Sequence, residues 1–443
     1  MFRGLLMVTS KFRTVIATAA LVLAGATACS TSDQSGSASG GAETRGTITW
    51  LSFPFPPGGA DVRKQLVAAF EKANPGITIK LVNAPTNTDT LRSMLTTQIS
   101  GGARSPDVYA GDVVWPAQFG EAGLALPLSG RLPSSFWKQF TPELVKSMTY
   151  KGKVMAAPFM SDEAFLYYRK DLLAKAHLPA PTTWEQLQTE AARLQARHLV
   201  KYGYIGQASS YEGLTCDWTE LMADAGGQVL DASQKHAAIN SPQSLHALQF
   251  MRGLISSGVA PQSMTSFEEP QAEQLFTSGQ VAFMRNWEFA YVDANSASSQ
   301  VAGKVGISTL PSFAGRPGAG NSTFGGWGLY VNPHTKHLGP DLTFIKWMTG
   351  AQAQQIIATK AGNIPTNAGV LSSPAVRGSS PVFTIASRYK LVARPATVPN
   401  YSQVSQAIYA NINAALAGTT SPQAALQTAA SQINSALSKG GGL

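Results

Sequence analysis

The 443-residue chain has little cysteine: only Cys29 and Cys216 occur. The fold must therefore rest on hydrophobic cores rather than on a disulfide framework, which a chain of this length permits. Charge is also sparse, at 13% of residues, and the formal net charge of +9 is not gathered into any dense Lys/Arg run. A nucleic-acid partner is therefore not expected.

The signatures of several enzyme classes are missing as well. The sequence contains no G-x-S-x-G, no G-K-[ST] and no H-E-x-x-H, the patterns of a hydrolase nucleophile, a phosphate-binding loop and a zinc site. The adjacent acids Glu268 and Glu269 are a poor glycosidase pair, because that chemistry needs two carboxyl groups facing each other across a bond. Cys216 lies in a helix-like stretch and is interpreted as a buried, small apolar residue. We therefore expect no enzyme, and no catalytic residue, cofactor or metal.

Residues 1–28 predict a secretory signal peptide. A basic segment at residues 11–13 precedes an apolar run at residues 15–26, and Ala26-Thr27-Ala28 leads directly into Cys29. This order is typical of a secretory signal. The run is too short for a membrane-spanning helix, and no run of spanning length follows it. The residues around Cys29 resemble the lipobox of bacterial lipoproteins, in which the cysteine is lipidated; an ordinary secretory signal with an incidental cysteine is the alternative.

Residues 29–46 predict a lipidated, flexible tether, because Ser30 to Gly46 is low in complexity and rich in Ser, Gly and Ala. The predicted location is extracytoplasmic, anchored to the cell membrane through Cys29. With Cys29 lipidated, Cys216 has no partner for a disulfide within the monomer.

From Thr47 the chain alternates short apolar strands with amphipathic helices. Strands are expected at Thr47–Leu51, Ile77–Val82 and Asp107–Gly111, with helices at Val62–Ala73 and Thr90–Ser100 between them. A β-α-β-α-β run implies a parallel sheet covered by helices. The pattern restarts with a strand at Phe165–Tyr168. Two lobes are expected, because the chain is too long for one ordinary core.

The segment Phe70–Ile77, F-E-K-A-N-P-G-I, joins a predicted helix to a strand. It resembles the F-E-x-x-x-P-G-I/V signature of the family 1 extracellular solute-binding proteins. Further segments match this family in order, and they are Pro106–Tyr109, Ala164–Leu173, Thr182–Leu187, Phe283–Trp287 and Gly325–Trp327. Tyr211–Leu214, and Arg394-Pro395 followed by Tyr401, narrow the resemblance to the trehalose/maltose-binding branch of ABC importers.

The resemblance implies an α/β, two-lobed periplasmic-binding-protein fold of type II with a hinged cleft between the lobes. The first lobe would take residues 47–156 and a returning piece at about 298–360. The second would take residues from about 157 to 297 and 361–443. The resemblance also implies closure around the ligand by hinge rotation, and a membrane ABC permease, with a separate ATPase, as partner. A monomer is expected.

Two acids are expected to contact the ligand. Asp112 follows the third predicted strand, at the carboxyl end where open α/β sheets place ligands. Asp162 precedes the strand at Phe165, about where the chain first crosses between lobes. The resemblance implies that both bind sugar hydroxyls. The alternatives are a helix cap for Asp112 and a turn residue for Asp162.

Trp287 and Trp327 are expected to be aromatic platforms. Flat aromatic faces pack against the C–H faces of pyranose rings. Trp287 lies between a predicted strand and helix, and Trp327 follows Gly325-Gly326, where a glycine permits close approach of the backbone to a ligand. Gly326 is therefore included in the predicted site. The alternatives are a core tryptophan and a glycine-rich bend.

Arg394 and Glu212 complete the predicted site. Arg394 matches a family arginine that binds sugar hydroxyls, and charged partners make the stronger hydrogen bonds. Glu212 precedes a predicted helix, and capping that helix is the alternative role. The acidic residue that the family carries before its first helix is missing here or displaced to Asp61, which leaves the identity of the sugar open.

The sequence thus predicts a lipid-anchored protein that captures a disaccharide or related oligosaccharide, trehalose-like or maltose-like, for an ABC importer. One alternative is a protein of the same fold for another solute, such as a polyamine or a peptide. A polyamine site should be rich in carboxylates, and the predicted Arg394 argues against it. An extracellular carbohydrate-active hydrolase or lyase is the other alternative.

Overall fold

The computed structural model describes residues 45–56, 61–316 and 318–439, all of which belong to one compact unit. The predicted signal peptide, the predicted lipidation site Cys29 and all but the last residues of the predicted tether lie outside the described residues. No described helix combines the length and the apolar character that crossing a membrane requires.

The first lobe is built on a six-stranded sheet that begins with the predicted β-α-β-α-β run. Its first elements are β1 (Gly46–Ser52), α1 (Arg63–Ala73), β2 (Ile77–Asn83), α2 (Thr88–Ser100) and β3 (Val108–Asp112). β1 pairs in parallel with β2 and with β3, as expected. Ile48 and Trp50 of β1 are buried against the apolar stripe of α1, which includes Phe70.

Antiparallel strands complete this sheet. β12 (Gly325–Val331) pairs with β3 on one side and with β6 (Ala156–Asp162) on the other, and β13 (Ile364–Pro365) pairs with β6. The strand order is therefore β13-β6-β12-β3-β1-β2. No strand is predicted from the sequence for β6 or β12, because Asp162 and the Gly325-Gly326 pair interrupt any apolar alternation.

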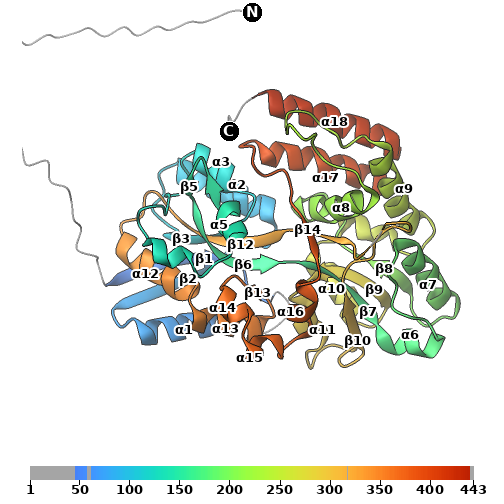
Figure 1. The fold of residues 1–443 in the computed structure, drawn as a ribbon, viewed down its shortest axis with the longest axis horizontal. Helices are drawn as coiled ribbons and strands as arrows, with labels where there is room; N and C mark the ends of the chain where they lie inside the picture. Colours follow the sequence, from blue (N-terminus) through green and yellow to red (C-terminus); the bar gives the residue numbers. More distant parts are fainter. Residues whose placement is uncertain (1–44, 57–60, 317, 440–443) are drawn as a thin grey trace, which may run out of the picture. The chain divides into compact units, whose positions relative to one another are not determined.

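The second lobe is built on a four-stranded sheet with the order β10-β7-β9-β8. Its elements are β7 (Ala164–Arg169), α6 (Lys170–Ala176), α7 (Trp184–Ala196), β8 (Tyr202–Ile205), α8 (Glu212–Ala225), α9 (Pro242–Ser256), α10 (Glu269–Thr277), β9 (Val281–Trp287), α11 (Ala290–Ala294) and β10 (Val305–Ser308). The C-terminal helices α17 (Tyr401–Ala417) and α18 (Pro422–Ser438) pack against each other and against α9, above α8 in Figure 1.

Two of the segments that connect the lobes are adjacent. Glu163 alone separates β6 from β7, so the chain crosses about where the sequence predicts (Figure 1). The return runs from β11 (Asn321–Thr323) through Phe324 into β12. The two segments lie side by side, because Gly325 is opposite Asp162 in register and the backbone N–H of Ala164 donates to Oγ of Ser322 at 2.8 Å.

The sheets correct the expected lobe boundaries. β10 pairs with β7 in the second sheet, so the chain returns to the first sheet at Gly325 and not near residue 298. β13 pairs with β6, so the first sheet also extends beyond residue 360. The apolar segment at Val305 carried no signal for which sheet it joins, because pairing partners are not encoded in periodicity.

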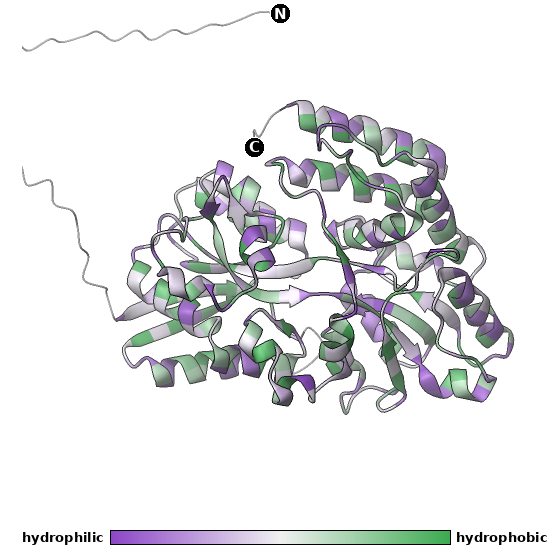
Figure 2. Ribbon diagram, viewed as in Figure 1, coloured by the Kyte–Doolittle hydropathy of each residue, from purple (hydrophilic) through white to green (hydrophobic). Residues whose placement is uncertain are grey.

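Shorter elements complete the described fold. They are α3 (Pro116–Glu121), α4 (Ser134–Trp137), α5 (Pro142–Ser147), β4 (Thr149–Tyr150), β5 (Lys153–Val154), a 3-10 turn at Gln262–Ser266, α12 (Leu338–Met348), α13 (Ala351–Ile356), a π-helical turn at Ile357–Ala361, α14 (Ala368–Leu371), α15 (Pro374–Arg377), α16 (Pro381–Ala386) and β14 (Lys390–Val392). β14 pairs with β11. Helices such as α1, α7 and α18 carry both hydrophobic and hydrophilic residues in Figure 2, as covering helices do.

Candidate ligand-binding site

A cavity lies between the two sheets, with walls from both lobes. Its empty volume, including the part that is open to solvent, is about 740 Å³. All seven predicted ligand-contacting residues line it, and they are Asp112, Asp162, Glu212, Trp287, Gly326, Trp327 and Arg394. The fold therefore brings together residues that are widely separated in the sequence.

Element ends position these side chains. Asp112 is the last residue of β3, Asp162 the last of β6 and Trp287 the last of β9. Gly326 and Trp327 lie at the start of β12, whose antiparallel direction brings its first residues to the same edge of the sheet. The cavity thus occupies the edge at which open α/β sheets place their ligands.

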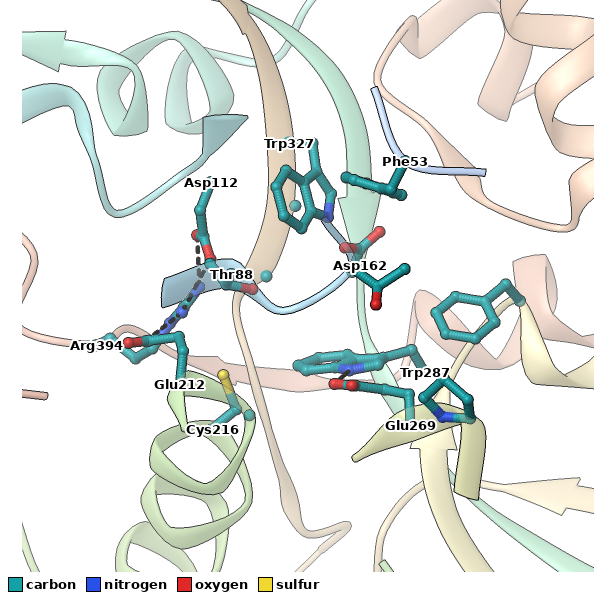
Figure 3. Close-up of a pocket in the computed structure, with 16 residues that line it drawn as sticks. Phe53, Thr88, Asp112, Asp162, Glu212, Cys216, Glu269, Trp287, Trp327 and Arg394 are labelled. Atoms are coloured by element: carbon teal, nitrogen blue, oxygen red, sulfur yellow. Dashed lines mark hydrogen bonds and ion pairs between the residues drawn. The ribbon is translucent and has the colours of Figure 1, made fainter. Parts of the chain in front are cut away.

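Arg394 is held between acids from different lobes. Its Nη2 donates to Oδ1 of Asp112 at 3.0 Å, and its Nη1 donates to Oε1 of Glu212 at 2.6 Å (Figure 3). The arginine side chain is only 2% exposed, and a charge buried to this extent needs such pairing. Within the described residues, Nε of Arg394 has no hydrogen-bond partner.

Glu212 is the first residue of α8 and is engaged mainly inside the protein. Its Oε1 also accepts from the hydroxyl of Tyr401, and its Oε2 accepts from the hydroxyl of Ser405 at 2.6 Å. Burial raises the pKa of Glu212 to about 7, although the Arg394 charge opposes this effect. Glu212 therefore acts chiefly as a support for Arg394.

Asp112 lines the cavity but does not cap the following helix α3, whose N-cap residue is Trp115 and has no side-chain cap hydrogen bond. Its Oδ1 accepts from the backbone N–H of Val114 at 3.1 Å in the turn that follows β3, while the same carboxylate binds Arg394. The turn contact and the cavity contact coexist. Trp115 is 2% exposed and stacks on Phe119 at 4.9 Å, so it is a packing residue.

Trp327 and Trp287 lie on opposite sides of the cavity in Figure 3. Trp327 belongs to the first lobe and packs edge-on against Phe53, with ring centroids 4.3 Å apart. Trp287 belongs to the second lobe, and its indole Nε1 donates to Oε1 of Glu269 at 3.2 Å. Two flat apolar surfaces therefore face a shared space.

Trp287 rests on a buried arginine. The guanidinium carbon of Arg285 lies 4.1 Å from the centroid of the indole ring. Arg285 is itself held by Asp217 at 3.0 Å and by Glu220 at 2.5 Å. A guanidinium stacked on an aromatic face holds the ring in place.

Asp162 lies between the two tryptophans in Figure 3. Its Oδ1 is buried without a hydrogen-bond partner among the described residues. Behind it, the carboxylate of Glu288 accepts from the backbone N–H of Glu163 at 3.2 Å and from Nδ2 of Asn363 at 2.8 Å. Burial, reinforced by the Asp112 carboxylate, raises the pKa of Asp162 to about 7. The unsatisfied oxygen is suited to accept a hydrogen bond from a ligand.

Gly326 meets a backbone requirement. Its φ of +137° is one that other residues rarely adopt, and a Cβ at this position would collide with the carbonyl oxygen of Met160. The glycine is needed for the close packing of β12 on β6. The expected close approach of this backbone to a ligand stays a prediction.

Sequence reasoning missed several lining residues. They are Phe53, Thr86, Thr88, Gly213, Cys216, Glu269, Pro270, Phe289 and Gly325. Cys216 is buried, as predicted, yet it also forms part of the cavity wall (Figure 3). Phe53 directly follows β1, and its place at a strand's carboxyl end was the available signal.

Glu268 and Glu269 diverge, as the sequence suggests. Glu268 accepts from Nδ2 of Asn87 at 2.8 Å, whereas Glu269 lines the cavity. Asp61 is engaged elsewhere: it forms an ion pair with Arg63 at 2.7 Å and is not among the lining residues. Asp61 therefore does not take the place of the missing family acid in this structure.

This chain is similar to known proteins over most of its length, across both lobes. The family model of bacterial extracellular solute-binding proteins matches residues 57–355. A probable ABC transporter-binding protein of Deinococcus radiodurans is 37% identical over 81% of this chain and 86% of its own length. A mannitol-binding protein of Pseudomonas aeruginosa is 27% identical over 68% of this chain and 69% of its own length. The structure of T. maritima MalE3 with bound maltose superposes with a TM-score of 0.82 at 33% identity, covering 87% of this chain and 98% of that one.

Proposed function

The chain belongs to the bacterial extracellular solute-binding proteins, and from this premise we propose that it captures a disaccharide or related oligosaccharide for delivery to a membrane ABC permease. A trehalose-like or maltose-like sugar is the proposed ligand. The similarity to a maltose-bound structure supports this class. The protein itself catalyses no reaction in this proposal, and ATP hydrolysis belongs to a separate chain.

One observation carries the proposal: two tryptophans from different lobes face one cavity that also presents charged groups (Figure 3). The indole faces of Trp287 and Trp327 suit the C–H faces of pyranose rings. Asp162 and Arg394 supply an acceptor and a donor for hydroxyl groups. Rejection of a wrong epimer follows, because its misplaced hydroxyl leaves these buried groups unpaired.

Ligand capture couples to movement of the lobes. Asp112 and Trp327 belong to the first lobe, and Glu212 and Trp287 to the second, so a sugar that contacts both favours the closed arrangement. Such a shift can be no larger than the difference in ligand affinity between the open and closed states. The crossings at Glu163 and Phe324, together with the later passage of the chain from β13 to the C-terminal helices, are the segments about which the lobes rotate.

The location and assembly of the protein are part of the proposal. A family of extracellular solute-binding proteins is consistent with a secretory signal at residues 1–28 and with lipidation of Cys29. A lipid anchor keeps the receptor close to its permease. We expect a monomer, since one chain supplies both walls of the cavity.

A polyol is the second candidate ligand, supported by the similarity to a mannitol-binding protein. A polyol offers hydroxyl groups to Asp162 and Arg394 but no ring for the tryptophans. Affinity for mannitol above that for every disaccharide favours this candidate.

Isothermal titration calorimetry with trehalose, maltose, maltotriose, glucose and mannitol tests the proposed function. We expect one or more saccharides to bind at a single site, with mannitol weaker. A protein that is folded by circular dichroism yet binds no member of the panel contradicts sugar capture. Chromatography of the sugars after incubation tests the hydrolase alternative, for which cleavage products would be the sign.

A further inference from the structure

The cavity is acidic, although the protein is basic overall. Four acids, Asp112, Asp162, Glu212 and Glu269, line it against one basic residue, Arg394. The whole chain carries 34 Lys and Arg against 25 Asp and Glu, so the sign of the charge is reversed inside the cavity. A cleft lined by one sign of charge concentrates ligands of the opposite sign.

Arg394 does not neutralise this acidity. Its two terminal nitrogens are shared between Asp112 at 3.0 Å and Glu212 at 2.6 Å, so one guanidinium faces two carboxylates. The sequence-based argument against a cationic ligand rested on a free positive charge at Arg394. Because Arg394 is paired with two carboxylates, that argument no longer holds.

The next basic group is compensated in the same way. Arg285 lies behind Trp287 at 4.1 Å and is bound to both Asp217 and Glu220. This cluster also has more carboxylates than cations. The Arg285 cluster behind Trp287 therefore adds no net positive charge to the surroundings of the cavity.

Asp162 and Glu269 are the carboxylates left for a ligand. Oδ1 of Asp162 is buried without a partner in the described part of the chain, and Oε1 of Glu269 accepts the neutral indole N–H of Trp287 at 3.2 Å. Burial, reinforced by Asp112, raises the pKa of Asp162 to about 7, although side-chain hydrogen bonds to Glu288 and Trp327 oppose this effect, so the balance of these effects disfavours the ionised form. A ligand cation would stabilise it.

We infer that the preferred ligand is an amine-bearing saccharide whose ammonium group occupies the space lined by Asp162 and Glu269, next to the Trp287 ring. Charge-assisted hydrogen bonds and a cation–π contact then act on one group. This inference rests on the proposed function and narrows its ligand class. A neutral sugar fills the hydrogen bonds of the cavity but leaves the excess charge uncompensated.

Matched sugars test the inference. Trehalose and maltose are compared by calorimetry, at pH 7 and low salt, with derivatives in which one hydroxyl is replaced by an amine at each position in turn. This replacement changes the charge but scarcely the size. We expect at least one amino sugar to bind tenfold or more tightly than its parent, and the ratio to shrink in 0.5 M NaCl, because salt screens charge.

Variants assign the effect to residues. Asp162→Asn and Glu269→Gln should bring the ratio of amino-sugar to parent affinity towards one. Glu143→Gln, which removes an exposed charge on α5 that is not among the lining residues of the cavity, should leave it unchanged. Thermal melting checks the folding of each variant. Because the two carboxylates are replaced separately, the inference can still be tested if one of the variants does not fold.

The outcomes separate the two proposals. Parent sugars that bind as tightly as all their amino derivatives overturn the inference and leave the proposed function standing. An advantage that persists in both carboxylate variants also overturns it. Absence of binding by every parent and every amino sugar overturns the proposed function, and this inference with it.

Discussion

Nδ2 of Asn87, at the start of α2 in the first lobe, donates to Oε1 of Glu268 in the second lobe at 2.8 Å. Neither residue lines the cavity. The contact joins the lobes beside the ligand site, where it is made only when the lobes are close together. It should therefore contribute to the closed state without touching the ligand.

Asn87→Ser should weaken binding of every ligand by the same factor, about fivefold, because a net hydrogen bond is worth about 1 kcal/mol. Serine keeps the helix cap that Asn87 provides to the N–H of Thr90, so α2 should remain intact. Asn87→Asp should weaken binding further, since a second carboxylate would then face Glu268. Calorimetry and ligand dissociation rates measure both effects. Factors that differ between ligands would show that Asn87 contacts the ligand instead.

Trp287→Ala should lower the affinity for the bound sugar at least about tenfold, about 1.4 kcal/mol, with folding intact. Trp287→Phe should retain part of the affinity, because it keeps an aromatic face but loses the donor to Glu269. Trp137→Ala, in α4 outside the cavity, serves as the control for removal of an indole. Equal affinities of wild type and Trp287→Ala would remove Trp287 from the site.

Stability should decrease as the pH rises from about 5 to about 8.5. Burial, with the Asp162 charge as a second cause, raises the pKa of Glu163 to about 8. A carboxyl whose folded-state pKa exceeds its unfolded value of about 4.3 binds its proton more tightly when folded. Stability is therefore largest below the unfolded pKa and falls as the pH rises through the folded one. The maximal slope is about 1.4 kcal/mol per pH unit for each proton.

Urea unfolding across this pH range, followed by circular dichroism, checks the sign. Glu163→Gln should flatten the dependence, and the exposed control Glu143→Gln should not. Because burial also raises the pKa of Asp162 and Glu212 to about 7, part of the dependence should persist. A wild-type protein whose stability increases towards pH 8.5 would refute the prediction.

Gly326→Ala should destabilise the protein by about 1–3 kcal/mol, the usual cost of one strained residue. Its φ is +137° and the added Cβ meets the Met160 carbonyl. Gly102→Ala is a matched control, because Gly102 also has a positive φ, of +79°, but has nothing within 4 Å of the added Cβ. Chemical denaturation should show the larger loss for Gly326→Ala. Equal losses would mean that contact with β6 does not matter.

The parts of the fold that local patterns encode could be predicted well. The first three strands and two helices follow apolar periodicity, and in the structure Thr183 forms a capping box of α7 with Gln186. The strands that form the walls of the cavity were harder. β12 begins with two glycines and β6 ends in Ser161 and Asp162, so glycine and polar residues replace the apolar alternation that would reveal a strand.

The predicted site residues all line one cavity. They could be identified from the sequence because element ends and family motifs marked them. The charge balance could not be predicted, since it depends on partners distant in the sequence. Arg394 looked like a free cation until the structure paired it with Glu212, 182 positions away. Glu269 was considered only beside its neighbour, because nothing in the sequence shows that α10 directs it towards Trp287.

Trp287 gives the molecule a built-in optical reporter. Its indole lies between the guanidinium of Arg285 on one side and the cavity on the other. Ligand binding should therefore displace solvent from one face of this fluorophore, while the Arg285 charge stays on the other face. Emission colour and intensity should therefore follow occupancy without any attached dye.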